Sequence, residues 1–335
     1  MTTARLTFVS VVFGPEVPLL RLQARSFAAF AHPDVVAEVI VLDNTAGGMA
    51  RKEQQALVAD FGVHGPSVRV LRGREVMKVP ATTGWRSQQV LKLGIAEQVG
   101  TPRYVVLDAK NHLVAPLGGD FFEAPDGRIR MGLPHSYAAH SLRPSLERVL
   151  TYLGLDLSLV DRFTTTATPF VLDTATVRSL VEELGAPTGR SFAEEFLDHD
   201  LTEFFLYSGW VRASGPWEEL FDFQPVECPV LWPRNATEEG VAAVSWWVSE
   251  RGTPFLGVHR RALLRLDPAG LEALASMWAD AGLFVSAEDA ATFITDFRRS
   301  CVRAERRAHL REAPGALRQR LRRLRGSTGT PRPGA

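Results

Sequence analysis

The sequence predicts an α/β fold in which helices flank a mostly parallel sheet. Short apolar runs rich in β-branched residues predict buried strands at 6–13, 38–43, 67–71 and 103–108. Segments with helical spacing of apolar residues lie between some of them, at 19–30 and 84–99. Strands that alternate with helices are typical of parallel sheets with both faces covered.

The second half of the chain is less regular. It contains further predicted strands at 129–133, 169–172, 230–232 and 254–258, and predicted helices at 142–153, 174–184, 192–207 and 238–250. No clear linker separates the two halves, and the sequence shows no internal repeat. We therefore expect one mixed α/β domain over 1–285, with a division into two lobes as the alternative.

The C-terminal part has a different character. Ser286, followed three residues later by Asp289, predicts the start of a helix. Residues 286–325 are rich in arginine and predict a basic amphipathic helical extension, and 326–335 predict a disordered tail. Such a helix could contact an anionic membrane surface, although basic helices in solvent are commoner.

Composition excludes several classes of protein. Basic and acidic residues number 38 each, so no net charge attracts the molecule to nucleic acid. The two cysteines are far apart and suggest neither a zinc site nor a disulfide framework. No apolar stretch approaches the roughly 18 residues of a membrane span, and the N-terminus does not resemble a signal peptide. We expect a cytoplasmic protein, which the basic helix could place at the inner membrane.

Two predicted strands end in an aspartate, Asp43 and Asp108. In open α/β sheets, ligands bind beyond the carboxyl ends of the strands, where both side chains should lie. Asp108 is followed by Lys110, Asn111 and His112. An acid there could bind a divalent cation, Mn²⁺ or Mg²⁺, that neutralises phosphate groups, with Asn111 and His112 as neutral helpers. Alternatively Lys110 itself supplies the positive charge, or Asp108 only caps a turn.

The helix predicted before Asp108 carries a polar stripe. Trp85, Gln88, Gln89 and Lys92 fall within about 100° of arc on a helix with 3.6 residues per turn. Amides suit sugar hydroxyls, a lysine suits phosphate and an aromatic ring suits a sugar or base. The stripe therefore favours a ligand pocket over a face that is merely solvated.

The segments 84–93 and 104–111 resemble a bacterial family of uncharacterised glycosyltransferase-like proteins, whose members look like GT-A enzymes and often accompany genes for surface polysaccharides. The similarity extends to 168–172, 203–209 and 257–261. It implies a GT-A-like sheet, a nucleoside-diphosphate-sugar donor and a carbohydrate acceptor. Lys110 replaces the second acid of the usual Asp-x-Asp pattern, which leaves the metal requirement open.

The resemblance also implies roles for single residues. Phe13 and Asp43, with Asn44, would frame the nucleotide; Asp43 could instead form the turn before Asn44. Glu203 resembles the acid on the acceptor side and is the candidate base for the acceptor hydroxyl; alternatively it is one acid of a solvated acidic helix. His259 would return to the metal or phosphate, although a lone histidine beside a strand is more often structural.

Other templates fail. The sequence has no GxGxxG turn after the first strand, no GxxxxGK[ST] loop and no GxSxG elbow. The interpretation is a glycosyltransferase, expected to be a hexosyltransferase. The alternatives are a sugar nucleotidyltransferase, whose typical basic glycine-rich first loop is missing, and an inert nucleotide- or glycan-binding protein.

Overall fold

A computed structural model describes residues 5–225 and 228–304. Its centre is a five-stranded sheet in the order β3-β2-β1-β4-β7. The strands are β1 (Leu6–Val12), β2 (Val36–Asp43), β3 (Val68–Arg72), β4 (Arg103–Asp108) and β7 (Phe170–Asp173). The first four are parallel, and only β7 runs antiparallel to its neighbour β4. The predicted α/β class with a mostly parallel sheet is confirmed.

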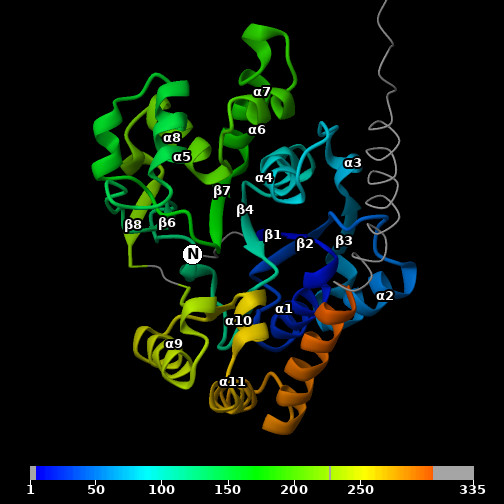
Figure 1. The fold of residues 1–335 in the computed structure, drawn as a ribbon. Coiled ribbons are helices and arrows are strands. Elements are labelled where there is room, and N and C mark those ends of the chain that lie inside the picture. Colours follow the sequence, from blue (N-terminus) through cyan, green and yellow to red (C-terminus); the bar gives the residue numbers. More distant parts are fainter. Residues whose placement is uncertain (1–4, 226–227, 305–335) are drawn as a thin grey trace, which may run out of the picture.

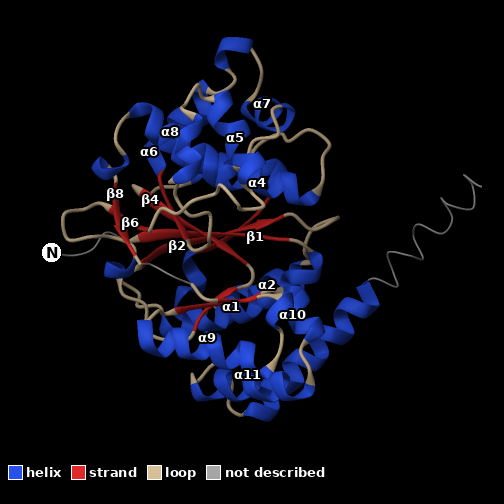
Figure 2. Cartoon of the chain, turned by 60° about the vertical axis from the view of Figure 1, so that its left-hand side comes forward, coloured by secondary structure: helices blue, strands red, loops and turns tan. Residues whose placement is uncertain are grey.

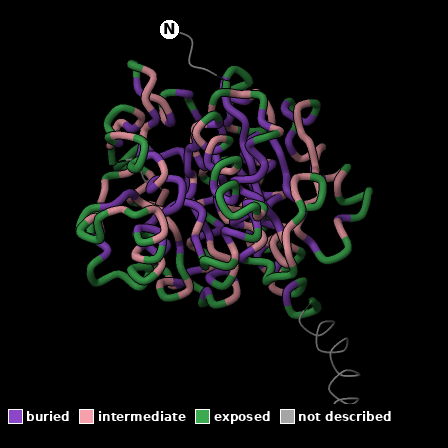
Figure 3. Tube along the Cα trace, turned by 90° about the horizontal axis from the view of Figure 1, so that it is seen from above, coloured by how far each residue is buried: buried purple, intermediate pink, exposed green. Residues whose placement is uncertain are grey.

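Helices cover both faces of this sheet (Figures 1 and 2). On one side lie α1 (Val17–Phe30) and α2 (Arg51–Asp60); on the other lie α4 (Gly84–Gly94) and α6 (Thr174–Glu183). Every residue of β1 is buried because both faces of the strand are covered. That explains its continuous apolar sequence. Figure 3 shows the buried trace running through the middle of the molecule.

Two small sheets complete the second half. One joins β5 (Asn111–Leu113), β10 (Phe255–Val258) and β9 (Val230–Leu231), and the other pairs β6 (Ile129–Gly132) with β8 (Phe221–Gln224). The β5–β10 pairing places the residues after Asp108 beside a strand about 145 positions later. Further helices are α3 (Gly73–Val76), α5 (Arg143–Tyr152), α9 (Glu238–Arg251), α10 (Arg260–Arg265) and α11 (Pro268–Asp280).

The predicted bounds of two helices differ from those in the structure. The helix expected over 192–207 is two helices, α7 (Phe192–Asp198) and α8 (Glu203–Ser214). The helix is interrupted near Asp200, which adopts a left-handed φ of 49°. The helix expected over 84–99 is α-helical only to Gly94 and continues as a 3₁₀ turn, Ile95–Gln98. The first break matters for function, because it places Glu203 in the first turn of a new helix.

The C-terminal helix begins as predicted. Ser286 accepts a hydrogen bond from the backbone N–H of Asp289 (3.1 Å) and donates to its carboxylate (2.8 Å). Residues 287–304 are helical. The rest of the expected basic extension and the expected tail lie outside the described residues. Across 5–225 and 228–304, no helix has the length and apolar character needed to cross a membrane.

Candidate functional site: a row of charges at the edge of the sheet

The carboxyl ends of β1, β2 and β4 meet at one edge of the central sheet. In the pairing of the strands, Val12 lies opposite Asp43 and Val11 lies opposite Asp108. The two aspartates therefore lie at the carboxyl edge of the sheet, as the sequence predicts, and the structure places them on either side of the end of β1. The antiparallel β7 begins at the same edge, which brings Thr168 next to Asp108.

Four side chains form a row of alternating charge, Glu203–Lys92–Asp108–Lys110, which we call the charge row. The Lys92 ammonium lies 3.1 Å from Oε1 of Glu203 and 3.0 Å from Oδ1 of Asp108. Lys110 pairs with the other oxygen of Asp108, Oδ2. The row connects α8, α4 and the end of β4, segments that are far apart in the sequence.

Lys92 is the most enclosed member of the row, with 8% of its side chain exposed, against 35% for Asp108. Burial alone would lower the pKa of Lys92, but the charges of Asp108 and Glu203 outweigh it and hold the pKa above its usual range. Burial would likewise raise the pKa of Asp108, yet Lys110 and Lys92 hold it well below its usual range. All the shifts favour the charged forms.

Asp108 is fixed on its backbone side as well. Its N–H donates to Oδ1 of Asn111 (2.9 Å), and its carbonyl accepts from Nε2 of Gln23 (3.0 Å). Gln23 also donates to the carbonyl of Asn111 (2.7 Å) and accepts from the hydroxyl of Ser10 (2.6 Å). The turn that carries Asp108, Lys110 and Asn111 is thus anchored to β1 and α1. Sequence analysis missed Gln23, which looks like any polar residue on a helix.

Thr168 is a second residue that sequence analysis missed. Its hydroxyl donates to Oδ2 of Asp108 (3.1 Å) and accepts from Nζ of Lys110 (3.2 Å). An ammonium has three N–H donors. The ammonium of Lys110 donates one hydrogen bond to Asp108 and one to Thr168. Within the described residues, its third N–H donor has no partner.

The donor set does not fit a divalent cation. Both carboxylate oxygens of Asp108 already contact lysine ammoniums, which would repel a metal ion. His259 uses Nδ1 to accept the N–H of Arg261 (3.1 Å) at the start of α10, and burial lowers its pKa. Among residues 5–225 and 228–304, no group of three or more His, Cys, Asp or Glu side chains could hold a metal.

His112, expected as a neutral helper of Asp108, lies in the core instead. Its Nε2 accepts from the indole N–H of Trp278 (2.9 Å), and burial lowers its pKa to about 4. The ring is therefore neutral at physiological pH and ties β5 to α11.

Glu16 joins the site from the 3₁₀ turn Gly14–Glu16 after β1. Burial raises its pKa to about 7, and the nearby charge of Asp108 adds to the shift. Arg260 lies 3.7 Å from its carboxylate and stacks over the ring of Phe13 (5.4 Å). A carboxyl group that titrates near neutral pH is typical of functional sites. The sequence shows an acid at this turn but does not show its burial. Glu16 was therefore not predicted as a site residue.

The side chains of the polar stripe on α4 differ in burial: some lie inside the protein and others are exposed. Lys92 points into the charge row, whereas Trp85 is 63% exposed and Gln88 is half-buried. Gln89 is buried, and its Oε1 accepts from Arg86 (3.3 Å). Its Nε2 has no hydrogen-bond partner within the described part of the chain.

Arg86 is the buried residue of α4 that sequence analysis passed over. It donates to the carbonyls of Leu201 (2.6 Å) and Phe196 (3.3 Å), which flank the break between α7 and α8. The contact fixes the chain just before Glu203 relative to α4.

Asp43 and Asn44 hold loops in place. The Asp43 carboxylate accepts from the backbone N–H groups of Thr45 (3.0 Å) and Met49 (2.7 Å) and from Arg72 (3.1 Å). Although its burial opposes the effect, these hydrogen bonds lower its pKa. Asn44 donates to Ser87 (2.9 Å) at the start of α4. The geometry favours the turn-forming alternative for Asp43 over contact with a nucleotide.

Residues 8–247 match the model of a family described as "Family of unknown function (DUF6492)". The chain belongs to this family. The match contains the charge row, Glu16 and Thr168, and it ends before His259 and Arg260. No curated protein sequence is significantly similar to the chain.

Several solved structures of glycosyltransferases share an overall likeness with this chain. Galactosyltransferase LgtC in complex with donor and acceptor sugar analogues is 12% identical, with a TM-score of 0.47, covering 87% of this chain and 96% of LgtC. The bifunctional glycosyltransferase WbbM is 13% identical, with a TM-score of 0.47, covering 84% of this chain and 51% of WbbM. GlyE of Streptococcus pneumoniae is 10% identical, with a TM-score of 0.42, covering 89% and 64%. We transfer no residue role from them.

Proposed function

We propose that the protein is a glycosyltransferase that uses a nucleoside-diphosphate-sugar donor and a carbohydrate acceptor. The observation that carries the proposal is the pair of lysines, Lys92 and Lys110, held on both sides of Asp108 at the carboxyl edge of the sheet. When a sugar leaves its donor, negative charge develops on the diphosphate, and fixed positive charge stabilises it. Ammonium groups can supply that charge in place of a cation.

Lys110 is the proposed direct contact of the diphosphate. It retains one N–H donor beyond those bound to Asp108 and Thr168. Lys92 acts behind it, because it holds both Asp108 and Glu203 and has little exposure. Phe13, Asn44 and Gln88 would line the nucleotide and sugar, and Trp85 offers an exposed aromatic face at the outer end of α4.

Glu203 is the proposed base. In the transfer, the acceptor hydroxyl oxygen bonds to the anomeric carbon, the bond from that carbon to the diphosphate oxygen breaks, and the hydroxyl proton passes to a carboxylate. The ion pair with Lys92 (3.1 Å) keeps Glu203 beside the reacting edge. Glu16 is the second carboxyl group at the site, and a pKa near 7 suits proton transfer at neutral pH.

An inert nucleotide- or glycan-binding protein is the second candidate. It is favoured by one observation: both oxygens of Asp108 are bound to lysines, so the carboxylate has no oxygen free to act on a substrate.

Thermal unfolding with a panel of nucleoside-diphosphate sugars in EDTA tests binding. A ligand at about 100 times its Kd adds roughly 2.7 kcal/mol and should raise the Tm by several degrees. Donor hydrolysis and transfer measured on the same ligand separate the two candidates. Binding with turnover supports the transferase, and binding without turnover supports the inert protein. No shift with any donor contradicts the transferase and leaves only the glycan-binding form of the second candidate.

A further inference from the structure

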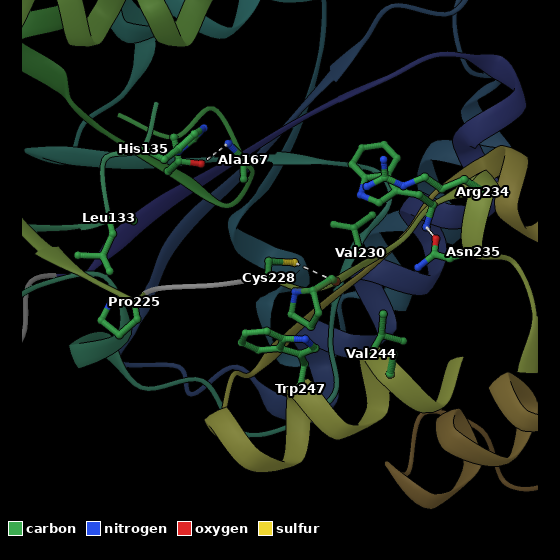
Figure 4. A pocket seen from close by; sticks show the side chains of 15 residues that line it. Leu133, His135, Ala167, Pro225, Cys228, Val230, Arg234, Asn235, Val244 and Trp247 are labelled. Atoms are coloured by element: carbon green, nitrogen blue, oxygen red, sulfur yellow. Dashed lines mark hydrogen bonds between the residues drawn. The ribbon is translucent and has the colours of Figure 1, made fainter. Parts of the chain in front are cut away.

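An open cavity of about 500 Å³ lies beside the charge row (Figure 4). Its walls come from the loop after β6, the segment before β7, the chain around β9 and one side of α9. The lining side chains include Trp232, Trp247, Arg234, Asn235, Thr165 and Cys228.

The cavity is connected to the charge row at two places. Cys228, in its wall, accepts a hydrogen bond from Nδ2 of Asn111 (3.4 Å), whose Oδ1 binds the backbone of Asp108. Ala167, also in the wall, directly precedes Thr168, which hydrogen-bonds to Asp108. A ligand in the cavity would therefore have one end near the reacting edge of the sheet.

The other rim of the cavity leads to the first strand. The ring of Trp232 packs on His259, with the ring centroids 5.4 Å apart. The next residue, Arg260, stacks over Phe13 and faces Glu16. The cavity and the edge of β1 thus share one continuous wall of rings and charges.

The lining suits a carbohydrate. Two tryptophans line the cavity, and Trp232 remains 41% exposed. Their indole N–H groups have no partner among the residues the structure describes. An aromatic face packs on the C–H groups of a sugar ring, while the amide of Asn235 and the hydroxyl of Thr165 offer hydrogen bonds to its hydroxyl groups.

The described part of the lining carries charge of one sign. Among the lining residues that the structure describes, Arg234 is the one with a permanent charge, and none of the others is an acid. Within the described residues, its guanidinium makes no ion pair. Since an arginine presents a fork that binds carboxylate or phosphate with two hydrogen bonds, the lining favours an anionic ligand.

We propose that this cavity binds the acceptor, and that the acceptor is a carbohydrate that carries a carboxylate or phosphate group. The anionic group pairs with Arg234, and the ring packs against Trp232 and Trp247. The attacking hydroxyl is presented toward the charge row, where Glu203 is the proposed base. This inference rests on the proposed function, because only a transferase needs a second sugar site beside the donor.

Calorimetric titration with a panel of uronic-acid- and phosphate-bearing oligosaccharides, each paired with its neutral counterpart, tests the inference without relying on turnover. The wild-type protein should bind acidic members about tenfold more tightly than neutral ones, and Arg234→Gln should abolish the difference. Arg265→Gln, at an exposed arginine outside the cavity, is the matched control and should retain the preference.

Trp247→Ala should weaken the binding of all the sugars about tenfold. Trp246→Ala, at the exposed neighbour that does not line the cavity, should leave their binding unchanged. Loss of the preference in Arg265→Gln, or equal binding of acidic and neutral sugars by the wild type, would overturn the charge assignment. If donors bind but no acidic sugar does, the cavity assignment is wrong while the proposed function stands. If donors also fail to bind, the proposed function itself is wrong.

Discussion

The charge row and the cavity beside it share a wall, yet they are built in opposite ways. In the charge row, every charged group has an opposite partner, and the turn that carries it is bound to β1 and α1. In the cavity, Arg234 makes no ion pair and the indole N–H groups of two tryptophans make no hydrogen bond within the described residues. The first arrangement can hold a fixed pattern of charge for one chemical step. The second leaves its binding groups free for a ligand.

The largest expected effect on stability comes from a substitution that disrupts the charge row. Lys92→Met leaves Asp108 and Glu203 without the ammonium between them and should lower the free energy of unfolding by about 3 kcal/mol. Asp108 keeps some exposure, which places the effect at the lower end of the range for buried pairs. Denaturant unfolding measures it, with Lys52→Met on the surface of α2 as control. A loss no larger than the control would show that Lys92 does not compensate the two carboxylates.

The next effect concerns Glu16 and depends on pH. Its pKa rises from 4.5 to about 7 on folding, so between those values the unfolded chain has lost a proton that the folded protein retains. Stability from this group is therefore lost as the pH rises through about 7. Glu16→Gln stays neutral and should be more stable than the wild type by about 2 kcal/mol at pH 8 and by less than about 1 kcal/mol at pH 5.

Unfolding curves at the two pH values measure the Glu16 difference. Glu182→Gln, at an exposed glutamate of α6, should show no such change with pH. A difference between Glu16→Gln and the wild type that does not change with pH would contradict the raised pKa of Glu16.

The smallest expected effect on stability belongs to the cavity. Arg234→Gln removes an exposed side chain without partners in the described structure, and should change the free energy of unfolding by less than about 0.5 kcal/mol. The same variant should lose the preference for acidic sugars. A large loss of stability would instead show that Arg234 supports the fold, and the contrast between the two regions would disappear.

Much of the fold could be predicted from the sequence. The strand at 103–108 was predicted with its observed bounds, because Tyr104, Val105, Val106 and Leu107 form an uninterrupted buried run. The strands β5 and β8 were missed, since they are short and exist through pairing with distant segments. The break before Glu203 was missed because a left-handed Asp200 leaves no mark in the spacing of apolar residues.

The candidate site could be predicted only in part. Asp108, Lys110, Lys92 and Glu203 were selected from the sequence, and the structure brings all four together. The pairing itself was not foreseen, because it joins side chains up to 111 positions apart. Glu16, Thr168 and Gln23 depend on burial and hydrogen bonds that only the folded chain shows. The proposed limits of the domain at 285 and 325 stay predictions.

The central claim is that lysine charge takes the place of a metal ion, and one variant tests it directly. Lys110→Asp restores the second acid of the Asp-x-Asp pattern and removes the ammonium from Asp108. We expect wild-type donor turnover in EDTA to be unaffected by added Mn²⁺. We expect Lys110→Asp to lose turnover in EDTA by at least about a hundredfold and to regain part of it with Mn²⁺. Wild-type turnover that is abolished by EDTA and restored by Mn²⁺ would contradict the claim.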